Sequence, residues 1–544
     1  MPDNNDFNVV DPRHAPCLQA FLATAPMLTR EEQAVVFRAA TQMLAGYYAH
    51  LPQKRVTQGF DPVARLKALA RAFEVGAVEA PLGLPDFHEA LCGVFAELRD
   101  FHTSYLLPAE FAGSIAFLPF QAALLQGEGG ADPQVLVTQT VTGLTHHPFG
   151  PGATIVTWNG SPIARVLQRL AAHSGGANPA AAASRGVAFL TQRPMQRMPP
   201  PAEEWVDVGY RPAGADPAIP ATNLRLIWRV APVAVAAPQR AEPLHPIALH
   251  MAVDTEGEAL LHHRQHVFSP RLLSADHAAQ ELDTDFAELR AWAGQTDGYS
   301  FGVLRIRKFS MDSGFLIEIR RILGLLPKTG LILDIRDNPG GYAAAAEQLL
   351  QFFTNVPVRP VQVQFLATPE TLALCRRQSP DQDTMKLDLS AWVPSLEVAV
   401  AAGKEWSDGF PMTDFDDVPP QRVYCGPVVL ITSARSYSAA DIFTAGFRDN
   451  GLGKILGVDA DTGAGGANMW THQQLALLTG DPQTTLPQGI ELRLAIRRVL
   501  RADGDQVLEE AGIVPDEVHR LTRRDLLEGD PDLIAHAVGM LKRG

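Results

Sequence analysis

Three serines lie close together where an apolar run leads into a helix-like stretch. The segment LITSARSYSAADIF, residues 430–443, has the pattern of a buried strand, a short loop and a helix, and it carries Ser433, Ser436 and Ser438. A serine at the first turn of a helix is commonly only an N-cap. As a nucleophile it would need a neighbouring base and a separate set of oxyanion donors. The segment alone leaves both interpretations open.

A second strand-to-helix turn could supply those donors. The sequence ILDIRDNPGG, residues 332–341, is an apolar run that ends in Asn338, Pro339 and the pair Gly340 and Gly341. Glycines let the backbone approach a ligand closely, and free N–H groups at the positive end of a helix dipole suit a developing oxyanion. An ordinary strand-to-helix turn would have the same pattern.

A base and a carboxylate are found in two further segments. His102 follows a helix-like stretch in ELRDFHTSYLLP, residues 97–108, and Glu509 and Glu510 lie side by side in VLEEAGIVPDEV, residues 507–518. Imidazole is the side chain best suited to proton transfer near neutral pH. The other histidine groups, around residues 146 and 262, have no carboxylates at metal-ligand spacing and are typical of a solvated surface. A solvated loop is the simple alternative for residues 507–518.

The surrounding elements fall into four stretches. Apolar residues at three- and four-residue spacing predict helices in residues 29–51 and 61–73, and β-prone runs broken by Gly and Pro follow. After residue 298, strand-like and helix-like segments alternate, which predicts a mostly parallel sheet with its working loops at the carboxyl ends of the strands. The expected division is a helical N-terminal domain (1–110), a β-rich domain (115–235), an insertion or linker (236–297), and an α/β core (298–544) that contains an insertion (358–420).

The composition excludes several classes of partner. The chain of 544 residues has a formal net charge of -14 and no long Lys/Arg cluster, so it lacks the basic footprint of a nucleic-acid or anionic-membrane binder. Its four cysteines form no C-x-x-C pair, and we expect no metal and no cofactor. No apolar stretch is long enough to span a membrane. The acidic N-terminus has no signal-peptide pattern, which predicts a cytoplasmic protein if the sequence is complete and an exported one if a signal was removed.

Taken together and in order, four motifs resemble those of the C-terminal-processing (tail-specific) peptidases and tricorn core proteases. They are D-F-H-T, L-D-I-R-D-N-P-G-G, S-Y-S-A-A-D-I-F and E-E-A-G-I-V-P-D. The resemblance implies a crotonase-like (ClpP-like) α/β core with a mixed sheet. It also implies that Ser438 is the nucleophile, and that backbone N–H groups of Gly340 or Gly341 and of Ala439 form the oxyanion hole.

This family has two mechanistic types. The tail-specific type uses a lysine in a T-x-G-K-G motif, whereas here Gly465 stands at the lysine position and no lysine occurs between Lys454 and Lys542. The tricorn-like type uses a histidine and a glutamate, which correspond to His102 and Glu509. Tricorn has a serine before the histidine, where this chain has Phe101. The resemblance therefore implies a His–Ser–Glu site in which Glu509 orients His102 directly, through water or through a neighbour.

The resemblance also implies a peptide-binding module. The stretch GPGATIVTWNGSPI, residues 150–163, is similar to a hallmark of the PDZ-like module that many members carry, and such a module binds peptide as an added strand. We therefore expect a serine endopeptidase that acts on polypeptides, and a homo-oligomer is compatible with this. The alternatives are a catalytically silent retinoid-, lipid- or peptide-binding protein of the same fold and, less well matched, a crotonase-type acyl-CoA enzyme.

Overall fold

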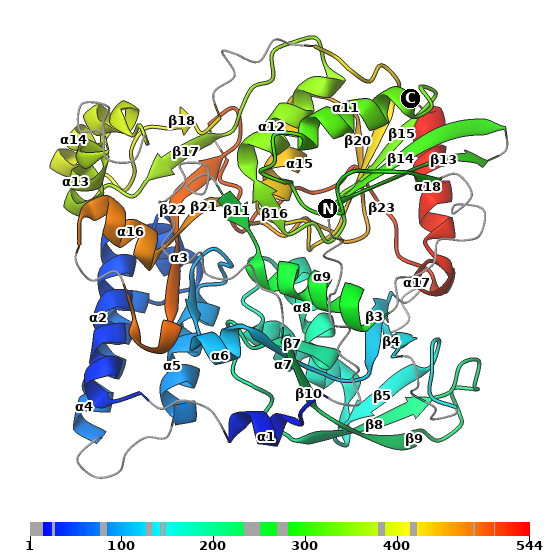
Figure 1. Ribbon diagram of the computed structural model, residues 1–544, viewed down its shortest axis with the longest axis horizontal. Helices are drawn as coiled ribbons and strands as arrows, with labels where there is room; N and C mark the ends of the chain where they lie inside the picture. Colours follow the sequence, from blue (N-terminus) through cyan, green and yellow to red (C-terminus); the bar gives the residue numbers. More distant parts are fainter. Residues whose placement is uncertain are drawn as a thin grey trace, which may run out of the picture.

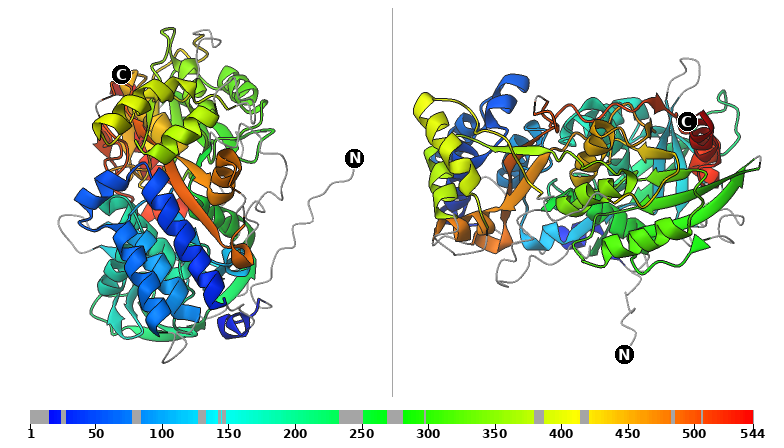
Figure 2. Two further views of the ribbon diagram at one scale, coloured as in Figure 1. Left: turned by 90° about the vertical axis from the view of Figure 1, so that its left-hand side faces the viewer. Right: turned by 90° about the horizontal axis from the view of Figure 1, so that it is seen from above.

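The computed structural model describes most of the chain and shows a mixed α/β protein (Figures 1 and 2). The described residues are 15–23, 28–76, 84–126, 133–141, 144, 148–232, 251–268, 281–296, 298–378, 387–413, 421–481, 485–504 and 506–543. Within these ranges, no helix is both long enough and apolar enough to cross a bilayer.

A seven-stranded sheet forms the centre of the α/β core. Its order is β12 (Glu281–Leu282), β13 (Leu289–Thr296), β14 (Tyr299–Ile306), β15 (Leu331–Asp334), β19 (Val428–Thr432), β20 (Lys454–Gly457) and β23 (Glu517–Val518). The strands from β14 to β23 are parallel, as the alternating pattern predicts, while β12, β13 and β14 are joined antiparallel. The loops after β15 and β19 therefore leave the same edge of the sheet.

Helices cover both faces of this sheet (Figure 1). Leu331 and Leu333 point into the core formed with α11 (Phe315–Leu325), α12 (Ala343–Leu350) and α15 (Ala439–Asp449). Ile332 points the other way and packs with α18 (Pro531–Arg543). Strands buried on both faces are apolar throughout, which explains the runs in the sequence. The predicted strands and helices from residue 298 to residue 358, and again from residue 427 to residue 458, are confirmed.

The N-terminal part is helical and packs beside a second sheet (Figure 2). Its helices are α1 (Leu18–Leu22), α2 (Arg30–Tyr47), α3 (Leu51–Thr57), α4 (Pro62–Gly76) and α5 (Leu84–Glu97). A capping box between Thr29 and Glu32 fixes the start of α2. The second sheet contains β1 (Ser104–Leu106), β17 (Gln362–Phe365), β18 (Phe410–Pro411), β21 (Ala467–Thr471) and β22 (Glu491–Leu500).

The second sheet joins the two ends of the chain. Strand β1 pairs antiparallel with the start of β22, so that Ser104 lies opposite Arg493. Strand β17 pairs with the other half of β22, and it belongs to the segment expected only as an insertion. That segment also holds α13 (Pro369–Arg377) and α14 (Val393–Ala402). The insertion at 358–420 thus contributes two strands, β17 and β18, to a sheet whose other strands come from distant parts of the chain.

The β-rich stretch forms a third sheet with two helices against it. Its strands are β3 (Phe120–Leu125), β4 (Gln134–Thr140), β5 (Thr154–Trp158), β6 (Ser161–Pro162), β8 (Trp205–Arg211) and β9 (Thr222–Ile227), and the helices are α7 (Ile163–His173) and α8 (Pro179–Thr191). The hallmark at residues 150–163 falls on β5, the following turn and β6. Two small ladders lie outside this sheet and include β2 (Ser114–Phe117), β7 (Gln192–Pro194), β10 (Arg229–Pro232), β11 (Met251–Val253) and β16 (Gly340–Tyr342).

Candidate active site

Ser438 lies between the loop after β19 and the first residue of α15, in an unusual backbone conformation. Its φ is 65° and its ψ is -120°, a region that residues with a Cβ rarely adopt, and the residue is completely buried. Strained backbone of this kind concentrates at functional sites. Ser436 has a structural role instead, because its hydroxyl donates to the Ile335 carbonyl at 2.8 Å and accepts from the Ser433 N–H at 3.0 Å.

His102 faces Ser438. Its Nε2 lies 2.6 Å from the Ser438 Oγ, although 336 residues separate them in the sequence. The histidine follows α5 in a turn that leads into β1, and the pairing of β1 with β22 holds that turn against the core. Complete burial lowers the pKa of His102 to about 4, despite the opposing charge of Asp100. The imidazole is therefore neutral at pH 7 and can accept the serine proton.

The other ring nitrogen of His102 faces a tyrosine. The Tyr437 hydroxyl lies 3.3 Å from His102 Nδ1, and the two rings stack with centroids 4.9 Å apart. The nearer oxygen of Asp100 is 3.9 Å from Nδ1, beyond hydrogen-bond distance. Nothing in the sequence marks Tyr437 as functional, since a tyrosine next to a buried strand has the pattern of an ordinary core residue.

Asp100 is the centre of a buried hydrogen-bond network beneath His102. Its Oδ1 accepts the backbone N–H of His102 at 2.8 Å. Its Oδ2 accepts from the Tyr48 hydroxyl at 2.9 Å, from His50 Nδ1 at 3.0 Å and from the Thr103 hydroxyl at 3.0 Å. Burial alone would raise the pKa of Asp100, but these neighbours lower it strongly. Asp100 is thus a fixed anion that positions the turn carrying His102.

Glu509 lies close to this network but contacts a lysine. Its Oε1 accepts from Lys54 Nζ at 2.8 Å, and Lys54 also donates to the Arg99 carbonyl at 3.2 Å. Within the described ranges, no hydrogen bond joins Glu509 to His102, and Glu509 Oε2 is buried with no partner. Complete burial raises the pKa of Glu509 well above its ordinary value, and the nearby Asp100 and Glu510 carboxylates add to this effect, although the Lys54 ammonium opposes it. No sequence signal marked Lys54, because a lysine on a helix is normally solvated.

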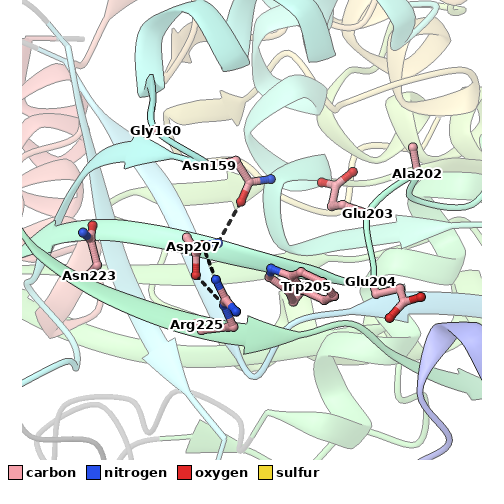
Figure 3. Close-up of a pocket in the computed structure, with 9 residues that line it drawn as sticks. All are labelled: Asn159, Gly160, Ala202, Glu203, Glu204, Trp205, Asp207, Asn223 and Arg225. Atoms are coloured by element: carbon pink, nitrogen blue, oxygen red, sulfur yellow. Dashed lines mark hydrogen bonds and ion pairs between the residues drawn. The ribbon is translucent and has the colours of Figure 1, made fainter.

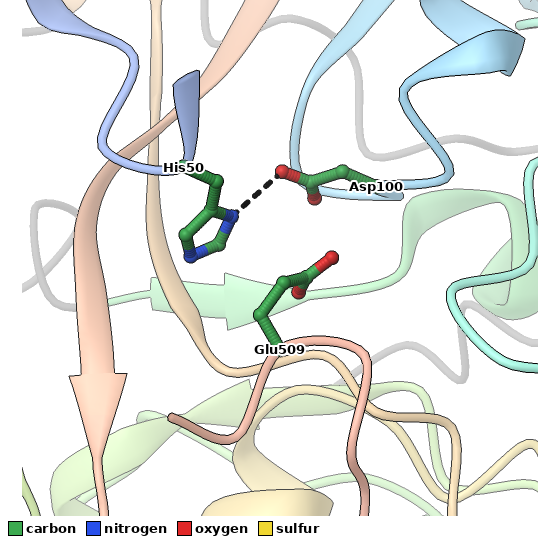
Figure 4. Close-up of side chains that lie close together, drawn as sticks. All are labelled: His50, Asp100 and Glu509. Carbon is green, nitrogen blue, oxygen red and sulfur yellow. Dashed lines mark hydrogen bonds and ion pairs between the residues drawn. The ribbon is translucent and has the colours of Figure 1, made fainter. Parts of the chain in front are cut away.

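His50, Asp100 and Glu509 have side chains that point toward one another from three different segments (Figure 4). Their ligand atoms lie within 4.8 Å, a spacing that a metal ion could bridge. However, His50 already donates to Asp100, and the Lys54 ammonium already lies against Glu509. The buried Lys54 ammonium thus already supplies the positive charge that a metal ion would bring to these carboxylates. The group therefore fits a supporting network better than a metal centre.

The predicted oxyanion donors lie next to Ser438. Ala439 is the first residue of α15, where an N–H has no acceptor within the helix. The turn at Gly340 and Gly341 is tied to the serine loop, because the Tyr437 N–H donates to the Asn338 carbonyl at 3.0 Å. Gly341 has φ 133°, and a Cβ there would lie 2.1 Å from the Phe309 carbonyl oxygen, so only glycine fits. The Gly340 N–H is engaged in this conformation, since it donates to Asn338 Oδ1 at 2.8 Å.

Gly465, at the predicted lysine position, packs under the Tyr437 ring. A Cβ at Gly465 would lie 2.1 Å from Tyr437 Cζ, and one at Gly463 would lie 2.6 Å from Tyr437 Cδ2. Both glycines therefore make room for the tyrosine. The Gly465 N–H donates to the Asp441 carboxylate at 2.8 Å, which fixes this loop to α15. A lysine side chain at position 465 and the Tyr437 ring would occupy the same space, so the chain can have only one of them here.

A surface hollow of about 850 Å³ lies elsewhere, over the third sheet (Figure 3). In it the Asp207 carboxylate accepts two hydrogen bonds from Arg225, at 2.7 and 2.8 Å, beside the half-exposed Trp205 ring. The lining residues are Asn159, Gly160, Ala202, Glu203, Glu204, Trp205, Asp207, Asn223 and Arg225. None of them is a serine, cysteine or histidine, so the hollow is not a second candidate for nucleophilic catalysis.

Residues 300–519 match the model of peptidase family S41. The chain carries a peptidase family S41 domain. S41 is a family of serine-type peptidases, and the S41 match includes Ser438, the Gly340–Gly341 turn and Glu509 but not His102. No curated protein sequence matches the chain.

Two solved structures are similar over nearly the whole chain. The crystal structure of mature CPAF has a TM-score of 0.68 at 19% identity and covers 94% of this chain and 98% of its own. The structure of mature CPAF complexed with lactacystin has a TM-score of 0.67 at 18% identity and covers 95% of this chain and 99% of its own. The likeness shows that the fold extends beyond the S41 domain to the helical and β-rich parts.

Proposed function

We propose that this S41 protein is a serine endopeptidase in which Ser438 is the nucleophile and His102 the general base. The observation that carries the proposal is the 2.6 Å distance between His102 Nε2 and the Oγ of a serine held at positive φ. A neutral imidazole against a serine hydroxyl is the arrangement that activates this nucleophile.

The reaction follows from these contacts. His102 Nε2 takes the proton of Ser438 Oγ as that oxygen bonds to the carbonyl carbon of a peptide. The Ala439 N–H and an N–H of the Gly340–Gly341 turn hold the resulting oxyanion. The imidazolium then gives its proton to the leaving amine, the C–N bond breaks, and water attacks the acyl-enzyme by the same route. Loss of one oxyanion donor would cost about 100- to 1,000-fold in rate.

Glu509 has an indirect role in this proposal. It holds the Lys54 ammonium, which in turn binds the Arg99 carbonyl just before the turn that carries Asp100 and His102. Removing the carboxylate would leave Lys54 held only by Glu510 and the Arg99 carbonyl, and would loosen that turn. Glu509 would thus position the base through Lys54 and the backbone, which is an indirect form of the orienting role that the resemblance implies.

The third sheet would present the polypeptide substrate. We assign β3 to β9, with α7 and α8, to the predicted PDZ-like module because the hallmark residues fall on β5 and β6. A peptide would be bound there as an additional strand. The specific observation that favours the silent binding-protein alternative is that Ser438 and His102 are both 0% exposed.

Labelling by a fluorophosphonate probe tests the proposal and separates the two functions. Wild type and Ser436→Ala should be labelled, and Ser438→Ala should not. Ser436→Ala is the matched control, because it removes a buried hydroxyl of the same loop that bonds only to backbone. If folded wild-type protein is not labelled, or if Ser438→Ala still is, the peptidase assignment is wrong and the binding-protein alternative gains.

A further inference from the structure

The proposed mechanism requires a hydrogen-bond acceptor for the second nitrogen of His102. Because Nε2 must be free to accept the proton of Ser438, the neutral imidazole carries its own proton on Nδ1. The ring is completely buried, so water cannot satisfy this N–H without entering the core. The acceptor must therefore come from the protein.

The side chains around Nδ1 leave one acceptor within reach. Asp100 Oδ1 is 3.9 Å away and already accepts the His102 backbone N–H. Glu509 Oε1 is bound to Lys54, and among the described residues neither Glu509 oxygen makes a hydrogen bond to His102. The Tyr437 hydroxyl oxygen lies 3.3 Å from Nδ1, and a serine-type triad would have a carboxylate in this place.

The position of Tyr437 is fixed on every side. Its hydroxyl accepts the Phe101 N–H at 3.2 Å, its ring stacks on His102 and meets the Phe101 ring edge-on at 5.3 Å, and Gly465 packs against the ring without room for a Cβ. The Tyr437 residue is itself completely buried. An acceptor held this firmly can select one ring tautomer of its neighbour.

We propose that Tyr437 is the positioning residue of His102, with its hydroxyl oxygen accepting the Nδ1–H and holding the imidazole in the tautomer that leaves Nε2 free for Ser438. The inference rests on the proposed peptidase function and refines it. Tyr437 thus has the orienting role that the resemblance assigned to Glu509, and it fills the space that a side chain at Gly465 would need.

The test compares wild type with Tyr437→Phe, which keeps the ring and its packing but removes the acceptor. In ¹⁵N-histidine NMR, with His102 assigned from a His102→Gln variant, wild type should show the Nδ1–H tautomer. Tyr437→Phe should lose this preference. This readout needs no substrate, so it remains informative even if the fluorophosphonate experiment rejects the peptidase.

Kinetics give the second readout. Tyr437→Phe should lower kcat about 10- to 100-fold with little change in KM, because a tautomer-fixing group acts on the chemical step. The acid limb of kcat/KM should move to lower pH by roughly half to one unit, since one hydrogen bond to the imidazolium is lost.

Tyr105→Phe is the matched control, because Tyr105 is another buried tyrosine whose hydroxyl bonds to a histidine, at 2.6 Å from His88 Nδ1. It should change neither the His102 tautomer nor the pH profile. A Tyr437→Phe protein that is folded and retains both the Nδ1–H tautomer and the wild-type acid limb would overturn the proposal.

Discussion

Two buried histidines of this protein share almost every local property. His102 faces the Tyr437 hydroxyl and His88 faces the Tyr105 hydroxyl, and in each pair the rings are stacked. Burial lowers the pKa of both histidines to about 4. Their other nitrogens differ. His102 Nε2 meets Ser438, whereas His88 Nε2 is buried with no partner in the described part of the chain.

The comparison shows that a perturbed histidine is not by itself a catalytic one. A shifted pKa reports burial, which a core histidine has as well as an active one. What distinguishes His102 is that the hydroxyl of a serine at positive φ lies 2.6 Å from its Nε2.

Exchanging each histidine for glutamine should give the largest contrast. His102→Gln should lower kcat/KM by about 10⁴-fold or more, because the general base is lost. His88→Gln should keep near-wild-type activity per folded molecule. Hydrolysis of a fluorogenic peptide by both variants, normalised to folded protein, is the measurement. Equal loss in the two variants would mean that burial, and not the contact with Ser438, sets the effect.

Gly465→Ala should disturb the His102–Tyr437 pair and leave the His88–Tyr105 pair intact. The added Cβ would lie within 2.1 Å of the Tyr437 ring and push it away from His102, so we expect roughly a 100-fold loss of activity. Gly324→Ala, in α11 with open space around the position, should leave activity unchanged and raise stability by up to about 1 kcal/mol. Activity and urea unfolding of both variants check this. A fully active Gly465→Ala variant would show that the position of the Tyr437 ring is not important for activity.

The pH dependence of stability should show that the two histidines are alike. Both have a folded-state pKa below the unfolded value of about 6.5, so the unfolded chain takes up protons first as the pH falls. The stability that each contributes is present above pH 6.5 and is lost toward pH 4, by up to about 3 kcal/mol each. Urea unfolding between pH 7 and pH 4 should show a smaller loss for His88→Gln than for wild type. An identical loss would refute neutral burial of His88.

Elements whose signals lie in neighbouring residues were predictable from the sequence. The strand-to-helix turns at Gly340 and Ser438 follow from apolar runs that end in turn residues, and the structure confirms those elements. The side-by-side placement of His102 and Ser438 rested on the family resemblance, since no spacing rule joins residues so far apart. Assignment of their catalytic roles remains a prediction that the variants test.

Contacts between distant segments were not predictable. The Lys54–Glu509 pair joins a helix of the N-terminal part to a loop near the end of the chain, and a lysine on a helix gives no sign that it is buried. Nothing in the sequence indicated the proposed acceptor for the His102 Nδ1–H either. Tyr437 has the pattern of a core aromatic residue, and only the three-dimensional structure shows its hydroxyl next to Nδ1. Such pairs depend on tertiary packing, which local sequence patterns do not predict.

The pairing of β1 with β22 has a consequence for the order of synthesis. Residue His102 is translated 336 residues before Ser438, and the strand β22 that holds its turn in place comes later still. At ribosomal rates of about 5–20 residues per second, this separation amounts to roughly 20 to 70 s. During that interval the nascent chain contains the proposed base without the proposed nucleophile, so under the proposed mechanism it could not hydrolyse itself or neighbouring nascent chains. The proposed site would be complete only after β22 has left the exit tunnel.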